Sequence, residues 1–257
     1  MTQMQEPSAL GRIVDLVRDL RERCSWDRVQ TRATLRPYLV EEALELDQAL
    51  AADNSVKIQS ELGDLLLHLA FQIVLGEELG EFGAEDVTQT IETKMKRRHP
   101  HLFGLGEKPE TWERQKREEY ATPDHSVLDG LPPTLPALLK AFRLQERAAG
   151  VGFDWPDAKG PRDKVAEELD ELDAELTDNP DNDRVEAEVG DLLFSVVNLA
   201  RKLGCDPRAA LEKANERFGQ RFRRVERLAQ RNDVDLGRAS LEELDVLWEE
   251  AKVGDRG

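Results

Sequence analysis

The chain repeats itself, and this internal repeat restricts its possible folds more than any other feature. Around residue 41 the sequence reads YLVEEALEL, and around residue 167 it reads KVAEELDEL. Further on, Glu61 and Asp64 in SELGDLLLHLAF match Glu188 and Asp191 in AEVGDLLFSVVNLA at an offset of 127 residues. Self-similarity at a fixed spacing is typical of a duplicated structural unit. The 257 residues are therefore expected to form two domains with the same fold.

The boundary between the two copies is predicted in the segment ATPDHSVLDGLPPTLP, which holds four of the 12 prolines of the chain. Clustered prolines and turn residues are typical of a linker. The expected organisation is an N-terminal domain at residues 1–122, a linker at 123–134 and a C-terminal domain at 135–257. Both domains then have an ordinary size.

Helices are expected throughout both halves. Neither half contains the alternating runs of Val and Ile that are typical of strands, and only 5% of the residues are aromatic. Pro37 and Pro161 stand near the expected first turns of the two acidic helices. The sequence predicts helices at 8–23, 35–51, 56–79, 84–98 and 110–120 in the first half, and at 135–149, 161–177, 183–203, 206–230 and 240–252 in the second. The predicted fold class is all-α, with a four-helix-bundle-like domain in each half.

The charge and composition of the chain exclude some classes of binding partner. The net charge is −17, and a protein that binds duplex DNA needs a basic face, so nucleic acid is not an expected partner. The start MTQMQEPSAL lacks the pattern of a signal peptide, and no apolar run is expected to reach membrane-spanning length, so no membrane partner is expected. Two cysteines, Cys24 and Cys205, make no disulfide framework, which suits the reducing cytoplasm.

The most informative segment is the apolar stretch that begins at Glu61, together with its copy at Glu188. On a helical wheel, apolar side chains cover most of the circumference, and polar ones fall in one narrow wedge. That wedge holds Glu61, Asp64, His68 and Gln72 in the first copy and Glu188, Asp191, Ser195 and Asn198 in the second. A helix that is apolar nearly all round is expected to be buried. Two carboxylates on such a helix are costly unless they are paired or bind a metal.

The preceding helix of each copy carries a complementary E-E-x-x-E pattern, whose acids share one face. The pattern consists of Glu41, Glu42 and Glu45 in the first copy and Glu167, Glu168 and Glu171 in the second. A short loop returns the chain antiparallel, so the two acidic faces are expected to meet across a helical hairpin. Carboxylates without cysteine or an essential histidine predict an all-oxygen site for Mg²⁺, with Mn²⁺ as a substitute.

Two other interpretations of these acids are possible from the sequence. E-E-x-x-E alone is expected by chance about twice in so acidic a chain and is then a solvated helix face. Chance does not explain why both acid patterns recur in register. A di-iron site needs Glu-x-x-His on two helices. His68 lies four residues after Asp64, and its counterpart is Ser195, so that interpretation is weak.

Cations and tryptophans follow the acidic helices at matching places in both copies. Lys213 and Arg217 are one helical turn apart, as are Lys94 and Arg98. Such pairs would hold phosphate oxygens, although a basic patch that balances nearby acids has the same pattern. The pairs Trp248 with Lys252 and Trp112 with Lys116 repeat in the same way, and Lys164 lies one turn before Glu168. A tryptophan ring stacks on a base while the lysine meets a phosphate, but a tryptophan in the core of an amphipathic helix gives the same pattern.

Several segments of the sequence, taken together, resemble the MazG family. The resemblance covers about residues 8–253 and rests on a set of segments that is highly specific as a whole. The segments are CSWD, YLVEEALE, ELGDLLLHLAF and KMKRRHPHLFG in the first half, and VGFDW, KVAEELDE, EVGDLLFSVVNLAR and KANERFGQRFRRVE in the second. Two positions depart from the family pattern, Ala187 in place of an acid and Ser25 in place of proline.

The resemblance implies the all-α NTP pyrophosphatase fold, a homodimer, and Mg²⁺-dependent hydrolysis of nucleoside triphosphates to monophosphate and pyrophosphate. It also implies broad base tolerance and a house-cleaning role in nucleotide pools. The implied catalytic and metal-binding residues are Glu168, Glu171, Glu188 and Asp191, with a second site at Glu42, Glu45, Glu61 and Asp64. The implied substrate-binding residues are Lys164, Glu167, Lys213, Arg217, Trp248 and Lys252. The C-terminal site is expected to be the main one, and a nucleotide sensor with negligible turnover is the alternative.

Overall fold

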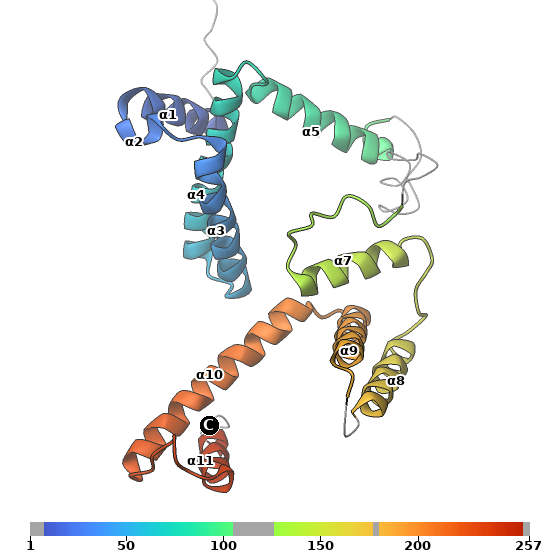
Figure 1. The fold of residues 1–257 in the computed structure, drawn as a ribbon. Coiled ribbons are helices and arrows are strands. Elements are labelled where there is room, and N and C mark those ends of the chain that lie inside the picture. The colour runs from blue at the N-terminus through green and yellow to red at the C-terminus, as the bar shows by residue number, and fades with distance from the viewer. Residues whose placement is uncertain (1–7, 105–125, 177–179, 254–257) are drawn as a thin grey trace, which may run out of the picture. The chain divides into compact units, whose positions relative to one another are not determined.

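The computed structural model describes residues 8–104, 126–176 and 180–253. The chain divides into two compact units, Met1–Glu110 and Thr111–Gly257. The described parts contain ten α-helices, one short 3₁₀ helix and no strand (Figure 1). The predicted all-α class is therefore confirmed. The predicted linker at 123–134 begins outside the described residues, and the predicted domain limits stay predictions.

The first unit is built around a hairpin of two long helices, α3 and α4. Its elements are α1 (Ala9–Arg23), α2 (Ser25–Arg28), α3 (Arg32–Ala51), α4 (Ser55–Glu78), α5 (Ala84–Arg98) and the 3₁₀ helix η1 (Pro100–Leu102). Both α3 and α1 pack against α4. Asn54 ends the short turn between α3 and α4, and its side chain accepts a hydrogen bond from the backbone N–H of Lys57. This cap fixes where α4 begins, and thus the register of its acids against those of α3.

The core of the first unit lies where α1, α3 and α4 meet. Its buried residues are Val17, Leu35, Ala70, Phe71, Val74 and Leu75. By length and composition alone, α4 also passes as a helix that could cross a membrane, contrary to the expectation that no apolar run is that long. Because α4 supplies four of these core residues, its apolar character has a structural role within the unit.

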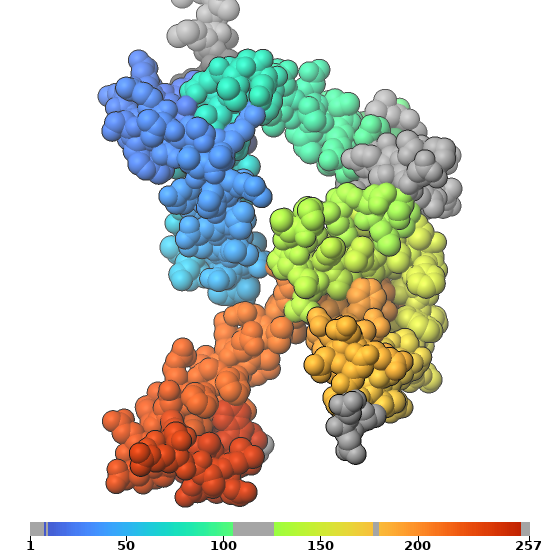
Figure 2. All heavy atoms as spheres, viewed as in Figure 1, coloured from blue at the N-terminus to red at the C-terminus, as the bar shows by residue number. Residues whose placement is uncertain are grey.

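The second unit repeats the hairpin and has three further helices. Its elements are α7 (Ala137–Ala149), α8 (Lys159–Glu175), α9 (Asn182–Lys202), α10 (Pro207–Arg231) and α11 (Leu241–Val253). The helices α8 and α9 pack against each other, and their atoms lie in contact in the space-filling view (Figure 2). The first helix, α7, packs on α9 and α10, and the last helix, α11, packs on α10. A separate core between α10 and α11 consists of Val225, Ala229, Leu247 and Ala251.

Most predicted helices agree with the structure to within two or three residues, and the differences have local causes. The helix predicted from residue 35 begins at Arg32, because Thr31 and Thr34 form a capping box there. Pro37 therefore lies inside α3 and not in its first turn, contrary to the prediction. The short helix α2 was not predicted. The helix predicted at 110–120 lies outside the described residues.

The prediction that the two apolar helices are buried is wrong for the single chain. On α9, Val189, Leu193, Phe194 and Val196 are exposed, and on α4 Leu62 and Leu69 are exposed. Large apolar side chains exposed in this number are typical of an interaction site.

Candidate metal centre

Three of the predicted metal ligands converge in the second unit. One carboxylate oxygen from each of Glu168, Glu188 and Asp191 lies within 4.8 Å of the other two. Glu168 projects from α8, and Glu188 and Asp191 project from α9, so the cluster spans the helical hairpin. Glu168 is 4% exposed, whereas Asp191 is exposed. One end of the cluster is thus buried and the other is open to a ligand.

Lys164 lies at the buried end of this cluster. Its Nζ atom is 2.7 Å from Oε1 of Glu168 and 2.8 Å from Oε1 of Glu167. Hydrogen bonds to these two carboxylates raise the pKa of Lys164. The ammonium group therefore stays charged and compensates the buried Glu168, which would otherwise be an unpaired charge in a poorly solvated place.

Glu171, the fourth predicted ligand, lies beside the three converging acids and is not one of them. Its pKa is raised, first by desolvation and then by the negative charges of Glu168, Glu167 and Glu188, while Lys164 acts in the opposite direction. Glu171 thus belongs to the same electrostatic group, with its carboxylate at the edge of the cluster.

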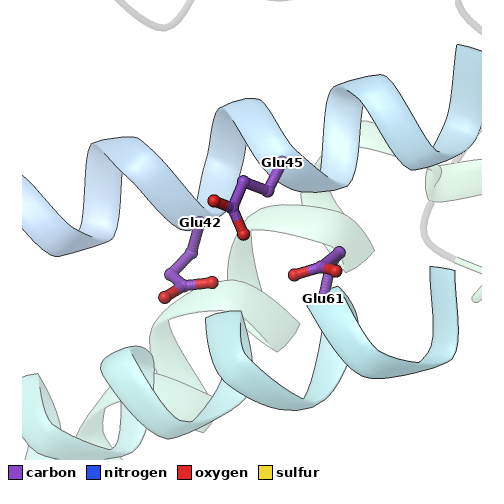
Figure 3. Close-up of side chains that lie close together, drawn as sticks. All are labelled: Glu42, Glu45 and Glu61. Carbon is purple, nitrogen blue, oxygen red and sulfur yellow. The ribbon is translucent and has the colours of Figure 1, made fainter. Parts of the chain in front are cut away.

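The first unit has a matching cluster on α3 and α4. Figure 3 shows the carboxylates of Glu42 and Glu45 on α3 turned toward Glu61 on α4, and one oxygen of each lies within 4.8 Å of the other two. Burial raises the pKa of Glu42, and the charges of Asp64, Glu45 and Glu61 raise it further. Asp64 is therefore close enough to act on the cluster electrostatically, although it is outside the converging three.

A histidine borders this first cluster, and the second unit has a buried serine, Ser195, in its place. Nε2 of His68 lies 3.9 Å from Oε1 of Glu42, and the His68 ring stacks on Tyr38 with 6.2 Å between centroids. Burial lowers the pKa of His68. Tyr38 stands at the position that Lys164 has in the second copy, so the two clusters differ in the group that borders their acids.

The arrangement of acids suits a hard divalent cation. Three carboxylates held within 4.8 Å repel one another, and a cation between them removes that repulsion. Neither group includes a thiol or an imidazole. Oxygen donors alone are the ligands that Mg²⁺ and Mn²⁺ prefer. The residues of both clusters therefore fit the predicted ion.

The predicted nucleotide-binding residues of α10 make no direct contact with the converging acids among the described residues. Lys213 and Arg217 are exposed, and among the described residues no hydrogen bond or ion pair links either one to Glu168, Glu188 or Asp191. In the first unit, Arg98 is buried at the end of α5.

The predicted residues of α11 pack against α10. The Trp248 ring lies 5.4 Å from that of Phe218, with the Arg221 guanidinium 5.1 Å from its centre. Lys252 pairs with Glu249 on its own helix. Trp112 and Lys116, the first-copy counterparts, lie outside the described residues.

Sequence reasoning missed an ion pair that fixes the loop before α8. Arg201 and Lys202 at the end of α9 both bind the carboxylate of Asp154. The hydrogen bond from Arg201 is the main reason that the pKa of Asp154 falls to about 2. The motif VGFDW contains this aspartate, and no local pattern pointed to a partner 47 residues away.

Comparison with known proteins agrees with this geometry. Residues 30–103 match the MazG nucleotide pyrophosphohydrolase domain. The nucleoside triphosphate pyrophosphohydrolase/pyrophosphatase MazG of Thermotoga maritima is 42% identical over 95% of each chain. The nucleoside triphosphate pyrophosphohydrolase of Escherichia coli K12 is 40% identical over 97% of this chain and 98% of its own. This chain belongs to the MazG family.

MazG membership confirms the predicted resemblance and the predicted enzyme class, a nucleoside triphosphate pyrophosphatase. A longer protein of Bacillus subtilis, YabN, is 40% identical over 94% of this chain and 51% of its own length. The MazG sequence is thus also found as part of a larger chain.

Proposed function

We propose that this MazG protein hydrolyses nucleoside triphosphates to nucleoside monophosphate and pyrophosphate with Mg²⁺ bound at Glu168, Glu188 and Asp191. The observation that carries the proposal is the convergence of these three carboxylates from two helices, with Lys164 at its buried end. The names of the Thermotoga and Escherichia relatives support the same reaction. Broad base tolerance and a house-cleaning role in the cytoplasm are part of the proposal.

In this reaction some residues of the chain bind the cation and the phosphates, and one accepts a proton. When bound, the divalent cation supplies charge neutralisation at the phosphates and polarises a water molecule. In this proposal Glu171, at the edge of the cluster, accepts a proton from the attacking water. In the same proposal the positive charge of Lys164, which pairs with Glu167 and Glu168, balances the charge that develops on the leaving pyrophosphate.

We further propose a homodimer in which the substrate-binding residues of α10 and α11 of one protomer lie close to the acids of the other. Two observations support this arrangement: α9 exposes the apolar side chains of Val189, Leu193 and Val196, and Lys213 and Arg217 have no ion pair among the described residues. Association through these apolar side chains, and contact of the cations of one protomer with the acids of the other, are both part of the proposal. The first-unit acids Glu42, Glu45 and Glu61, with Asp64 beside them, form a second site of lower activity in this proposal.

A substrate panel with product identification tests the proposed reaction. The wild type is incubated with Mg²⁺ and each of the common nucleoside triphosphates, and the products are separated by anion exchange. Glu168→Gln is expected to remove most pyrophosphate release, while the equivalent Glu42→Gln retains most of it. Steady formation of monophosphate excludes the sensor function, whereas tight nucleotide binding without product would support the sensor and overturn the enzyme.

A further inference from the structure

The two ends of the α8–α9 hairpin are held together by different means. At one end α8 ends at Glu175 and α9 begins at Asn182, so a short segment of the chain joins the two helices. At the other end Lys159 begins α8 and Lys202 ends α9, and the whole length of the hairpin separates these two residues in the sequence. This open end is closed by side chains of the loop before α8 and of the last turn of α9. Asp154, Trp155, Arg201 and Lys202 are called the brace below.

The charged part of the brace ties the loop to α9. Arg201 donates hydrogen bonds to both carboxylate oxygens of Asp154, and Nζ of Lys202 lies 3.2 Å from Oδ2 of the same residue. The Lys202 Nζ also donates a hydrogen bond of 2.6 Å to the backbone oxygen of Trp155. The side chains of Asp154, Arg201 and Lys202 are only 23%, 12% and 16% exposed. Water screens these charges less than those of a surface pair, so their attraction is stronger.

The aromatic part of the brace ties the loop to α8. The Trp155 ring packs on Gly160 in the first turn of α8, and a Cβ atom at Gly160 would lie 2.4 Å from the ring. Only glycine therefore allows this close approach. Gly160, Lys164 and Glu168 follow one another at intervals of one helical turn. The brace thus connects the end of α9 to the helix that carries Glu168.

The first unit has the acid pattern and lacks the cations of the brace. At the offset of 127 residues, Arg201 and Lys202 correspond to Val74 and Leu75 of α4, which are buried core residues. The acid of the brace has a counterpart in Asp27, so only the cations are missing. Glu168 is buried in the unit that has the brace, whereas its counterpart Glu42 is half-buried in the unit that lacks it.

We infer that Asp154 is a positioning residue, which through Arg201, Lys202 and the packing of Trp155 on Gly160 holds α8 against α9 so that Glu168 converges with Glu188 and Asp191. The inference rests on the proposed function. Three carboxylates repel one another before an ion binds, and this repulsion favours separation of the two helices. A brace that opposes the separation keeps the acids in place, so less free energy is lost in ordering them when the ion binds.

The dissociation constant for Mn²⁺ tests the inference without substrate. It is measured by electron paramagnetic resonance in a Glu61→Gln background, which removes one of the three converging acids of the first unit. Asp154→Asn keeps the shape of the side chain and removes its charge. It is expected to raise the dissociation constant about three- to tenfold, which is less than the usual loss when a group bonded directly to a metal ligand is removed.

Gly160→Ala tests the aromatic part of the brace. The added methyl group displaces the Trp155 ring, so the dissociation constant for Mn²⁺ is expected to rise in this variant too. Alanine favours a helix more than glycine does, so the rise would not come from a weaker α8.

The matched control is Arg184→Met, which breaks an ion pair with Glu175 that links the same two helices at the end where the chain already joins them. It is expected to leave the dissociation constant unchanged. Circular dichroism at the temperature of the binding experiment checks folding, and if Asp154→Asn does not fold, Gly160→Ala decides.

A purely stabilising role of Asp154 predicts a different result. Asp154→Asn would then have a lower melting temperature and an unchanged dissociation constant for Mn²⁺, and this would overturn the inference, as would an equal loss of affinity in Arg184→Met. If the background variant binds Mn²⁺ but releases no pyrophosphate from adenosine triphosphate, the proposed reaction fails and the dissociation constants still decide the inference. A background variant that binds no Mn²⁺ would overturn the proposed metal site and the inference together.

Discussion

At the scale of single residues, the charges around Glu168 explain why the cluster tolerates a buried acid. Sequence spacing predicted Lys164 one turn before Glu168, and the structure adds that its ammonium contacts both Glu167 and Glu168. The convergence of Glu168, Glu188 and Asp191 was predicted correctly, because i,i+3 and i,i+4 spacing determines helix faces. The position of Glu171 at the edge depends on side-chain rotamers, which spacing does not determine.

Replacing Lys164 by methionine tests this compensation. Lys164→Met leaves Glu168 without its cation, so we expect a lower melting temperature without Mg²⁺ and a larger increase when Mg²⁺ is added, since the ion then takes over the compensation. Lys159→Met breaks the exposed pair with Asp163 on the same helix. It should change neither the melting temperature without Mg²⁺ nor the increase that Mg²⁺ causes. Thermal unfolding with and without Mg²⁺ measures both, and equal behaviour of the two variants would refute the role of Lys164.

Asp154 predicts a specific pH dependence of stability. Its pKa in the folded protein is about 2, below the ordinary value of 3.8, so its contribution to stability is complete above about pH 4 and is lost as the pH falls toward 2. Asp154→Asn should therefore be less stable than the wild type at pH 6, and the difference should shrink at pH 3. Urea unfolding at both pH values measures this, with the exposed Asp245→Asn as control. A difference that is independent of pH would contradict the assignment.

At the scale of helices, the sequence predicted the limits of the helices well and their burial less well. The limits of α5 were predicted at 84–98 and observed as Ala84–Arg98, because Gly83 precedes an acidic first turn and Pro100 follows the helix. The start of α3 was missed because the capping box at Thr31 determines it, and Pro37 is tolerated inside the helix. Burial of α4 and α9 could not be predicted from the wheel, because an apolar circumference does not distinguish a core helix from one with an exposed interaction face.

The packing of α3 on α4 predicts the effect of a core substitution. Leu35 is 1% exposed and contacts the core cluster of the first unit. Leu35→Ala should lower the free energy of unfolding by about 2–5 kcal/mol, since it removes buried methyl groups and leaves a cavity. Leu10→Ala, at a position that is largely exposed on α1, is the matched control. Denaturant unfolding compares the two, and a loss below about 1 kcal/mol for Leu35→Ala would show that the site is not tightly packed.

At the scale of the whole molecule, the repeat gives two helical hairpins. They share the same pattern of acids but differ in the side chains that border those acids. The first cluster borders Tyr38 and His68, and the second borders Lys164 and Ser195. The duplication was visible in the sequence because the acids stay in register at an offset of 127 residues. A cavity of about 590 Å³ in the second unit was not predicted, because it depends on how side chains from α7, the loop after it and α9 fill space.

The exposed apolar face of α9 predicts association of two chains. A single chain has a mass of 29.1 kDa, and light scattering of the wild type should give twice this value. Leu193→Glu introduces a charge into the apolar face and should shift the mass to that of one chain. Val56→Glu, at an exposed position at the start of α4, should not change the mass. A wild type that is monomeric at micromolar concentration would contradict the proposed homodimer.

Binding of Mn²⁺ followed by electron paramagnetic resonance tests the central claim most directly, because free and bound Mn²⁺ give different signals and no substrate is needed. The wild type should bind Mn²⁺ in competition with Mg²⁺, Asp191→Asn should lose the stronger site, and adding Glu61→Gln should remove the remainder. Undiminished Mn²⁺ binding by the double variant, or a wild type that leaves the signal of free Mn²⁺ unchanged, would contradict the account.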